Sequence, residues 1–182
     1  MAIESGAHEL GPESARLVLR TSRTGAAAKA GHDLVIEVTS WKATIEVGES
    51  LSQTSIQLTA DATSLRVRQG TGGMQALSDN DRASIQKTID DDVLKRKGIE
   101  FRSTRVNVAP DRAQISGQGE LELVGRVNPI DFEVAIGGDG KLRASATVTQ
   151  SSWGIKPYSA LFGALKVADV VAVELEATLP QS

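Results

Sequence analysis

The chain has 182 residues, a formal net charge of −3 at pH 7, two histidines and no cysteine. This length suits one domain, and the absence of cysteine excludes disulfides and thiolate metal sites. Weak negative charge argues against a nucleic-acid partner, and two histidines are too few for a histidine-rich metal site. No secretory signal and no run of ~20 apolar residues is present. We therefore expect a cytoplasmic protein without a cofactor, a metal or stable membrane insertion.

The first third of the chain alternates apolar and polar residues. Residues 1–14 are polar and contain glycine and proline, so we expect a flexible tail followed by a single domain over residues 15–180. Leu17 and Leu19 alternate with arginines and predict a first strand at residues 15–20. The small residues 24–30 predict one helical turn that is closed by Gly31.

Two long strands follow, and each changes the parity of its apolar residues midway. Residues 34–38 place apolar side chains at even positions, whereas residues 41–47 place them at odd positions. A β-bulge near Thr39–Ser40 would produce this change. The second strand, residues 56–67, changes parity in the same way. Long strands with such changes are typical of strongly curved sheets.

A helix is predicted after the flexible loop at residues 69–73. Ser78 is a suitable N-cap, and lysines before Gly98 suit the end of the helix. The acidic run Asp90–Asp92 leaves its length open. The loop itself lacks the Lys-Ser/Thr of a phosphate-binding P-loop. One apolar stripe is predicted along the helix, at Ile85, Ile89 and Val93.

Alternation resumes over residues 99–108, 113–123, 130–136, 142–148 and 171–179, with a further change of parity before Val106. The second and third of these segments form a hairpin. A long apolar connection, residues 153–169, precedes the last strand. The sequence thus predicts a mainly β fold in which eight antiparallel strands close into a barrel, with one α-helix in a crossover connection.

Many inward positions of this barrel carry small residues, among them Ala60, Gly117, Gly119, Ala144 and Ala146, and only 3% of the chain is aromatic. We interpret this as an apolar cavity; the alternative is that small residues let the helix or the opposite wall approach closely. Burial of one isoprene unit gains at most ~4 kcal/mol, against ~4–15 kcal/mol for association. The cavity therefore favours long hydrocarbon chains.

Several segments in order resemble the YceI-like family of lipocalin-like barrels: DDVLKRKG, IEFRSTRV, ISGQGELELVGRVNPIDFEVAI and ASATVTQSSWGI. The resemblance covers residues 15–179. It implies an eight-stranded antiparallel lipocalin-like barrel, with a helix beside it and an apolar pocket for a polyprenyl chain. Two segments depart from the family pattern: AAAKAGHDL, and the insert PYSALFGALKVAD, which is longer and more apolar than expected.

The candidate site follows from this picture. Residues 153–167 are either a lid that touches ligand or a structural plug. His32 and the arginines Arg66 and Arg68 are candidates for contact with a polar head group. The candidate cavity residues are inward-facing or belong to the connection: Leu19, Ile36, Trp41, Ile56, Leu58, Phe101, Leu121, Phe132, Val148, Trp153, Tyr158 and Phe162.

Three functions are compatible with the sequence. The first is a soluble, non-enzymatic protein that sequesters or transports an isoprenoid lipid, either a polyprenyl chain or the tail of an isoprenoid quinone. The second is an enzyme that acts on an apolar substrate with His32, beside Asp33, as the base; a structural histidine is the competing interpretation. The third is an interaction protein with a filled barrel, which could form a homodimer through an exposed edge or the connection.

Overall fold

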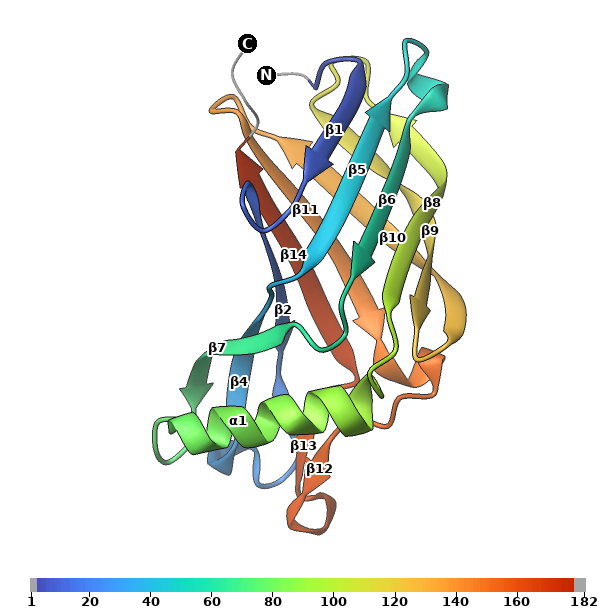
Figure 1. Ribbon diagram of the computed structural model, residues 1–182. Helices are drawn as coiled ribbons and strands as arrows, with labels where there is room; N and C mark the ends of the chain where they lie inside the picture. Colours follow the sequence, from blue (N-terminus) through green and yellow to red (C-terminus); the bar gives the residue numbers. More distant parts are fainter. Residues whose placement is uncertain (1–2, 179–182) are drawn as a thin grey trace.

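The computed structural model describes residues 3–178 and is mainly β with one α-helix (Figure 1). An antiparallel sheet of eleven strands curls around the core in the order β1-β5-β6-β8-β9-β10-β11-β14-β2-β4-β7. Its strands are β1 (Gly6–Leu10), β2 (Ala15–Thr21), β4 (His32–Val38), β5 (Trp41–Val47), β6 (Ser55–Ala60), β7 (Leu65–Gly72), β8 (Ile99–Val108), β9 (Gln114–Leu123), β10 (Arg126–Ile136), β11 (Lys141–Thr149) and β14 (Val170–Thr178).

The count of eight strands is not confirmed, because both long predicted strands break. The first divides at Thr39–Ser40 into β4, which pairs with β2 and β7, and β5, which pairs with β1 and β6. The second divides into β6 and β7 at residues 61–64. Thr39 N–H donates to Ser64 O at 2.9 Å, and Asp61 N–H donates to Ser40 O at 3.0 Å, so the two breaks lie together. The changes of parity mark a shared corner of the sheet rather than bulges.

A true irregularity explains the third change of parity. In β8, the register with β9 shifts between Ser103 and Arg105, just before Val106. An extra residue at such a shift exchanges the odd and even sequence positions that face the core. Apolar side chains after the shift therefore stay on the core face although their parity in the sequence changes. The predicted shift within this strand is thereby confirmed.

The prediction of a flexible tail is wrong for its described part. Ile3 is 1% exposed, and β1 pairs with β5 so that Leu10 lies opposite Ala43. The polar residues of β1 concealed the strand, because it covers the sheet edge with few apolar side chains. Residues 1–2 of the predicted tail and residues 179–180 of the predicted domain, with the end of the last predicted strand, lie outside the described residues.

The glycines of β9, in the β9–β10 hairpin, allow close packing of aromatic rings. Gly117 lies opposite Phe132, and Gly119 lies opposite Ser103. A Cβ atom at Gly119 would overlap the ring of Phe101, and one at Gly117 would overlap a β8 carbonyl. Phe101 and Phe132 then meet edge to face, with ring centroids 5.6 Å apart. At these two positions the small residues permit close approach, which was the alternative to a cavity.

The helix α1 (Asp79–Thr88) lies across one end of the curled sheet (Figure 1). Ser78 is its N-cap as predicted: Asp81 N–H donates to Ser78 Oγ at 3.1 Å, and Ser78 N–H donates to the Asp81 carboxylate at 2.9 Å. The acidic run does not end the helix. It forms one π-helical turn over Ile89–Val93, which continues directly from α1.

Replacing Ser78 by alanine is expected to destabilise α1 by about 1 kcal/mol, because it removes the N-cap oxygen. Hydrogen bonds from the Ser78 hydroxyl and N–H hold the pKa of Asp81 below its usual value. The contribution of this carboxylate is therefore present above the unfolded pKa of ~4 and lost as pH falls through the folded pKa. Amide exchange of α1 at graded pH measures both effects. Asp81→Asn is the control, because α1 should then lose this acid-dependent fraying; persistence of the fraying would contradict the assignment.

A second, small sheet completes the same end of the molecule. It contains β3 (Arg23–Thr24), β12 (Ser159–Ala160) and β13 (Leu165–Val167), in the order β12-β13-β3. The long predicted connection therefore contains a hairpin. The predicted turn before Gly31 is a 3-10 turn at Ala28–Ala30. Within residues 3–178, none of the helices has both the length and the apolar character needed to cross a bilayer.

Candidate ligand-binding cavity

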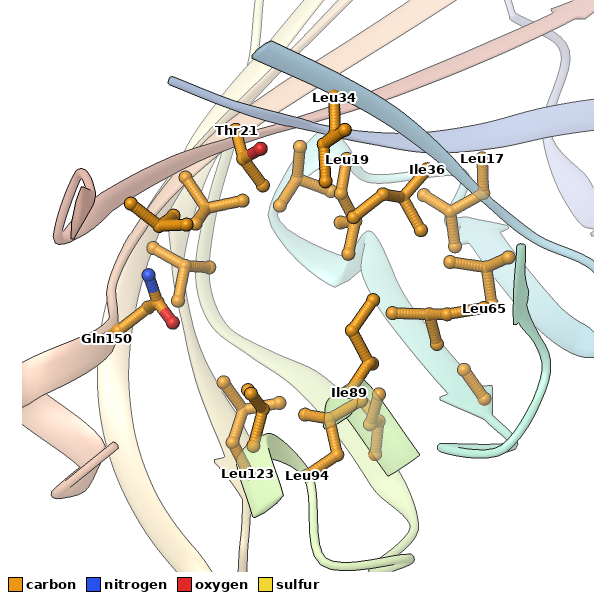
Figure 2. Close-up of a pocket in the computed structure, with 18 of the residues that line it drawn as sticks. Leu17, Leu19, Thr21, Leu34, Ile36, Leu65, Ile89, Leu94, Leu123 and Gln150 are labelled. Carbon is orange, nitrogen blue, oxygen red and sulfur yellow. The ribbon is translucent and has the colours of Figure 1, made fainter. Parts of the chain in front are cut away.

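The concave face of the sheet encloses a cavity of about 930 Å³. Leu17 and Leu19 of β2 and Ile36 of β4 project into it from one wall, while Ile89 and Leu94 approach from the helical side (Figure 2). The predicted helical stripe lies against this space, since Ile85 and Val93 also line it. The apolar stripe, which runs from α1 into the π-helical turn Ile89–Val93, therefore forms part of the cavity wall.

Most of the cavity residues proposed from the sequence come together in this lining. They come from β2, β4, β6, β8, β9, β10, β11 and the chain before β12, and they are Leu19, Ile36, Ile56, Leu58, Phe101, Leu121, Phe132, Val148 and Tyr158. Ala144 and Ala146 of β11 line the same space. At these alanines the small side chains leave open volume, as the cavity interpretation requires. Contact of the lining with a ligand stays a prediction.

Three proposed cavity residues lie outside the lining. Trp41 is buried among the core residues at the corner of the sheet. Trp153 is 2% exposed and packs with Leu121, Val148 and Ile155 in a separate cluster. Its indole Nε1–H donates to Leu121 O at 2.9 Å. This tryptophan is therefore a structural plug behind the cavity wall.

Phe162 is the third residue outside the lining. It lies fully exposed in the turn of the β12–β13 hairpin, with φ of 56°. Other hairpin residues do line the cavity, namely Tyr158, Leu165 and Val167. The predicted connection thus divides into a plug at Trp153, a wall formed by the hairpin strands, and an outward-facing turn.

Arg66 and Arg68 do not reach the cavity. They alternate along β7 with Leu65 and Val67, which are buried, so the arginines point to the outer face of the sheet. Arg66 Nη1 donates to Leu65 O at 2.9 Å, and Arg68 Nε donates to Glu37 at 2.5 Å. Neither arginine lines the cavity, and their proposed contact with a polar head group stays a prediction.

His32 lines the cavity but does not form a dyad with Asp33. Its Nε2 lies 2.7 Å from Gln75 O, and because a carbonyl only accepts, Nε2 carries the proton. Asp33 instead accepts from the backbone N–H of Arg23 at 2.8 Å. The histidine therefore fastens β4 to the loop at residues 73–77. Across residues 3–178, no three histidine or carboxylate side chains gather as a metal site.

Among the polar side chains of the lining, the sequence interpretation missed Thr21 and Gln150. Thr21 Oγ1 is buried and has no hydrogen-bond partner among the described residues. Gln150 is 9% exposed, and its Nε2 donates to Ala168 O at 3.1 Å. Figure 2 shows both side chains at the cavity wall. Continued parity was the available signal: Thr21 follows Leu17 and Leu19 on the inner face, and Gln150 follows the inward positions of β11.

A curled antiparallel sheet with a helix across one end and an apolar cavity inside defines the class of fold. A family model described as the YceI-like domain matches residues 17–179. The chain therefore belongs to the YceI-like family, as its sequence segments indicated.

One solved structure supports the same fold. BcnA of Burkholderia cenocepacia superposes with a TM-score of 0.62 at 12% sequence identity, over 89% of this chain and 94% of that protein. The YCEI protein of Campylobacter jejuni gives a TM-score of 0.49 at 15% identity, over 80% of this chain and 85% of that one. No curated protein shows significant sequence similarity to the chain.

Proposed function

We propose that the protein binds one isoprenoid lipid, a polyprenyl chain or the tail of an isoprenoid quinone, in the cavity and so sequesters or transports it. The observation that carries this proposal is the apolar cavity of about 930 Å³. Ligand pockets of proteins occupy roughly 300–1,000 Å³, so this one is near the upper end. The absence of a His32–Asp33 contact removes the main argument for the alternative in which His32 is a catalytic base.

The energetics favour a long chain. A buried CH₂-sized group contributes ~0.8 kcal/mol, and association costs ~4–15 kcal/mol before any net affinity appears. One isoprene unit hardly offsets this cost, whereas several units do. The alanines Ala144 and Ala146 leave room for such a chain beside β11. We therefore expect selection by length.

Two polar side chains of the lining, Thr21 and Gln150, suit a small uncharged end group. Thr21 Oγ1 can donate or accept one hydrogen bond, and Gln150 retains a side-chain oxygen beyond its bond to Ala168. A buried polar atom without a partner costs about 1–3 kcal/mol. A hydroxyl or a quinone carbonyl of the ligand would remove this cost at Thr21.

Titration of lipid-free protein with polyprenols of increasing length tests the proposal. We expect affinity to rise with each added isoprene unit until the cavity is full. Thr21→Val keeps the shape of the side chain and should weaken binding of a polyprenol relative to the matching hydrocarbon by roughly five- to tenfold. Thr147→Val, at an exposed position of β11, is the matched control. Equal affinity for short and long polyprenols, or no binding of either, would reject the proposed function.

A further inference from the structure

The turn of the β12–β13 hairpin exposes large apolar side chains. Phe162 is fully exposed and Leu161 is 57% exposed, with φ of 56° and 50° in the left-handed region. Non-glycine residues adopt this region at an energetic cost. Figure 1 shows the turn extending past α1, at the end of the molecule away from β1. We call Leu161 and Phe162 the hairpin tip.

The hairpin is held firmly at its base. β13 pairs with β3, Ala27 N–H donates to Ala164 O at 2.8 Å, and Ala168 N–H donates to Ser22 O at 2.7 Å. The Leu165 side chain fills the space beside Gly31, where a Cβ atom would overlap it. Because the base is fixed by these contacts, the hairpin tip is presented in one direction.

The hairpin also borders the cavity. Tyr158, Leu165 and Val167 line the cavity, and Tyr158 is itself 52% exposed. Met74, from the loop held by His32, lines the same cavity and is largely exposed. Apolar side chains therefore lead from the hairpin towards the cavity, whose lining also includes Asp81, Arg23 and Lys166.

The charge around the hairpin differs from that of the whole chain. Segments 22–31 and 152–168 contain Arg23, Lys29, Lys156 and Lys166 and no aspartate or glutamate, although the whole chain has a net charge of −3. Arg23 pairs with Asp33, with 3.9 Å between Nε and Oδ1, whereas the three lysines are exposed. Asp91, in the π-helical turn that follows α1, pairs with Lys87 and Arg96. Basic residues around exposed apolar side chains are typical of segments that bind the surface of anionic membranes.

We propose that the hairpin tip docks on an anionic lipid bilayer. Leu161 and Phe162 enter the boundary between head groups and acyl chains, and the exposed lysines Lys29, Lys156 and Lys166 lie over anionic head groups. A second copy of the chain is a poorer occupant, because a symmetric contact would bring two cationic ends together. The consequence for lipid transfer, entry of the ligand directly from the bilayer, rests on the proposed function; the docking itself does not.

Flotation of the full chain with vesicles tests the docking. With vesicles of phosphatidylcholine and about one third phosphatidylglycerol, we expect binding that falls about tenfold or more for the double variant Leu161→Ser/Phe162→Ser. Lys156→Gln/Lys166→Gln should weaken binding to these vesicles, and pure phosphatidylcholine should bind less. Val127→Ser, at an exposed valine of β10 outside the hairpin, is the matched control. Circular dichroism melts verify that each variant is folded.

Undiminished flotation of the folded tip variant would overturn the proposal, as would equal binding to both kinds of vesicle. A dimer that the tip substitutions dissociate, without vesicle binding by the parent chain, would identify a second copy as the occupant and also overturn it. Polyprenol uptake from detergent separates the two proposals. The tip variant should retain this uptake, whereas failure of the parent chain to take up polyprenol while it still floats would reject only the lipid-carrier function.

Discussion

Replacing Ala146 by phenylalanine is expected to reduce the affinity for a long polyprenol by about a hundredfold or more, roughly 2.7 kcal/mol, without unfolding the protein. Ala146 of β11 lines the cavity and lies between Phe132 on β10 and Val173 on β14. A phenyl ring at this position projects into the space that the lipid chain would occupy. Isothermal titration with a polyprenol measures the loss.

The matched control for this substitution is Ala135→Phe, at an exposed position of the outer face of β10. It adds the same ring to the same sheet without entering the cavity, so affinity should stay at the wild-type level. Unchanged binding by the folded Ala146→Phe variant would mean that the lipid does not occupy this cavity.

Replacing Trp153 by alanine is expected to destabilise the protein by about 3–5 kcal/mol, because the largest fully buried side chain is lost. Trp153→Phe isolates the hydrogen bond to Leu121 O. This variant retains most of the packing but leaves the Leu121 carbonyl without its donor, so we expect it to lower the free energy of unfolding by ~1–3 kcal/mol. Urea denaturation measures both changes in the free energy of unfolding.

Trp41→Phe is the matched control for this hydrogen bond. Trp41 is also buried, but its Nε1 has no partner among the described residues. The same substitution there removes an unsatisfied donor and should cost clearly less than at Trp153. Equal destabilisation by the two substitutions would show that packing alone, rather than the bond to Leu121, makes Trp153 important.

Strand positions were predictable because alternation is a local property of the sequence. The changes of parity at Thr39–Ser40 and before Val106 were placed correctly, yet one is a corner and the other a shift of register. Whether a change of parity is a corner or a shift of register depends on the hydrogen-bond partners of the strand. Ser64, which accepts a hydrogen bond from Thr39, lies far along the chain, so the local sequence does not reveal it. β1 escaped notice because an edge strand needs few apolar residues.

The residues of the candidate site were predictable where alternation along a strand identifies the side chains that face the inside of the sheet. Leu19 and Ile36 were found in this way, and Thr21 would have been found by continuing one more step. Alternation does not show where along a strand the inner face borders the cavity and where it borders packed core. Trp41 therefore faces solid core instead. In the hairpin no alternation exists, so the outward direction of Phe162 depends on a backbone turn that composition does not specify.

The central claim is that the cavity holds one isoprenoid lipid, and native mass spectrometry of the purified full chain tests it most directly. We expect a single non-covalent adduct whose mass matches an isoprenoid that solvent extracts from the protein, or the formation of such an adduct when polyprenol is added. The Ala146→Phe variant should lose this adduct. A protein that remains at the bare chain mass in the presence of excess polyprenol would show that the cavity does not hold an isoprenoid lipid.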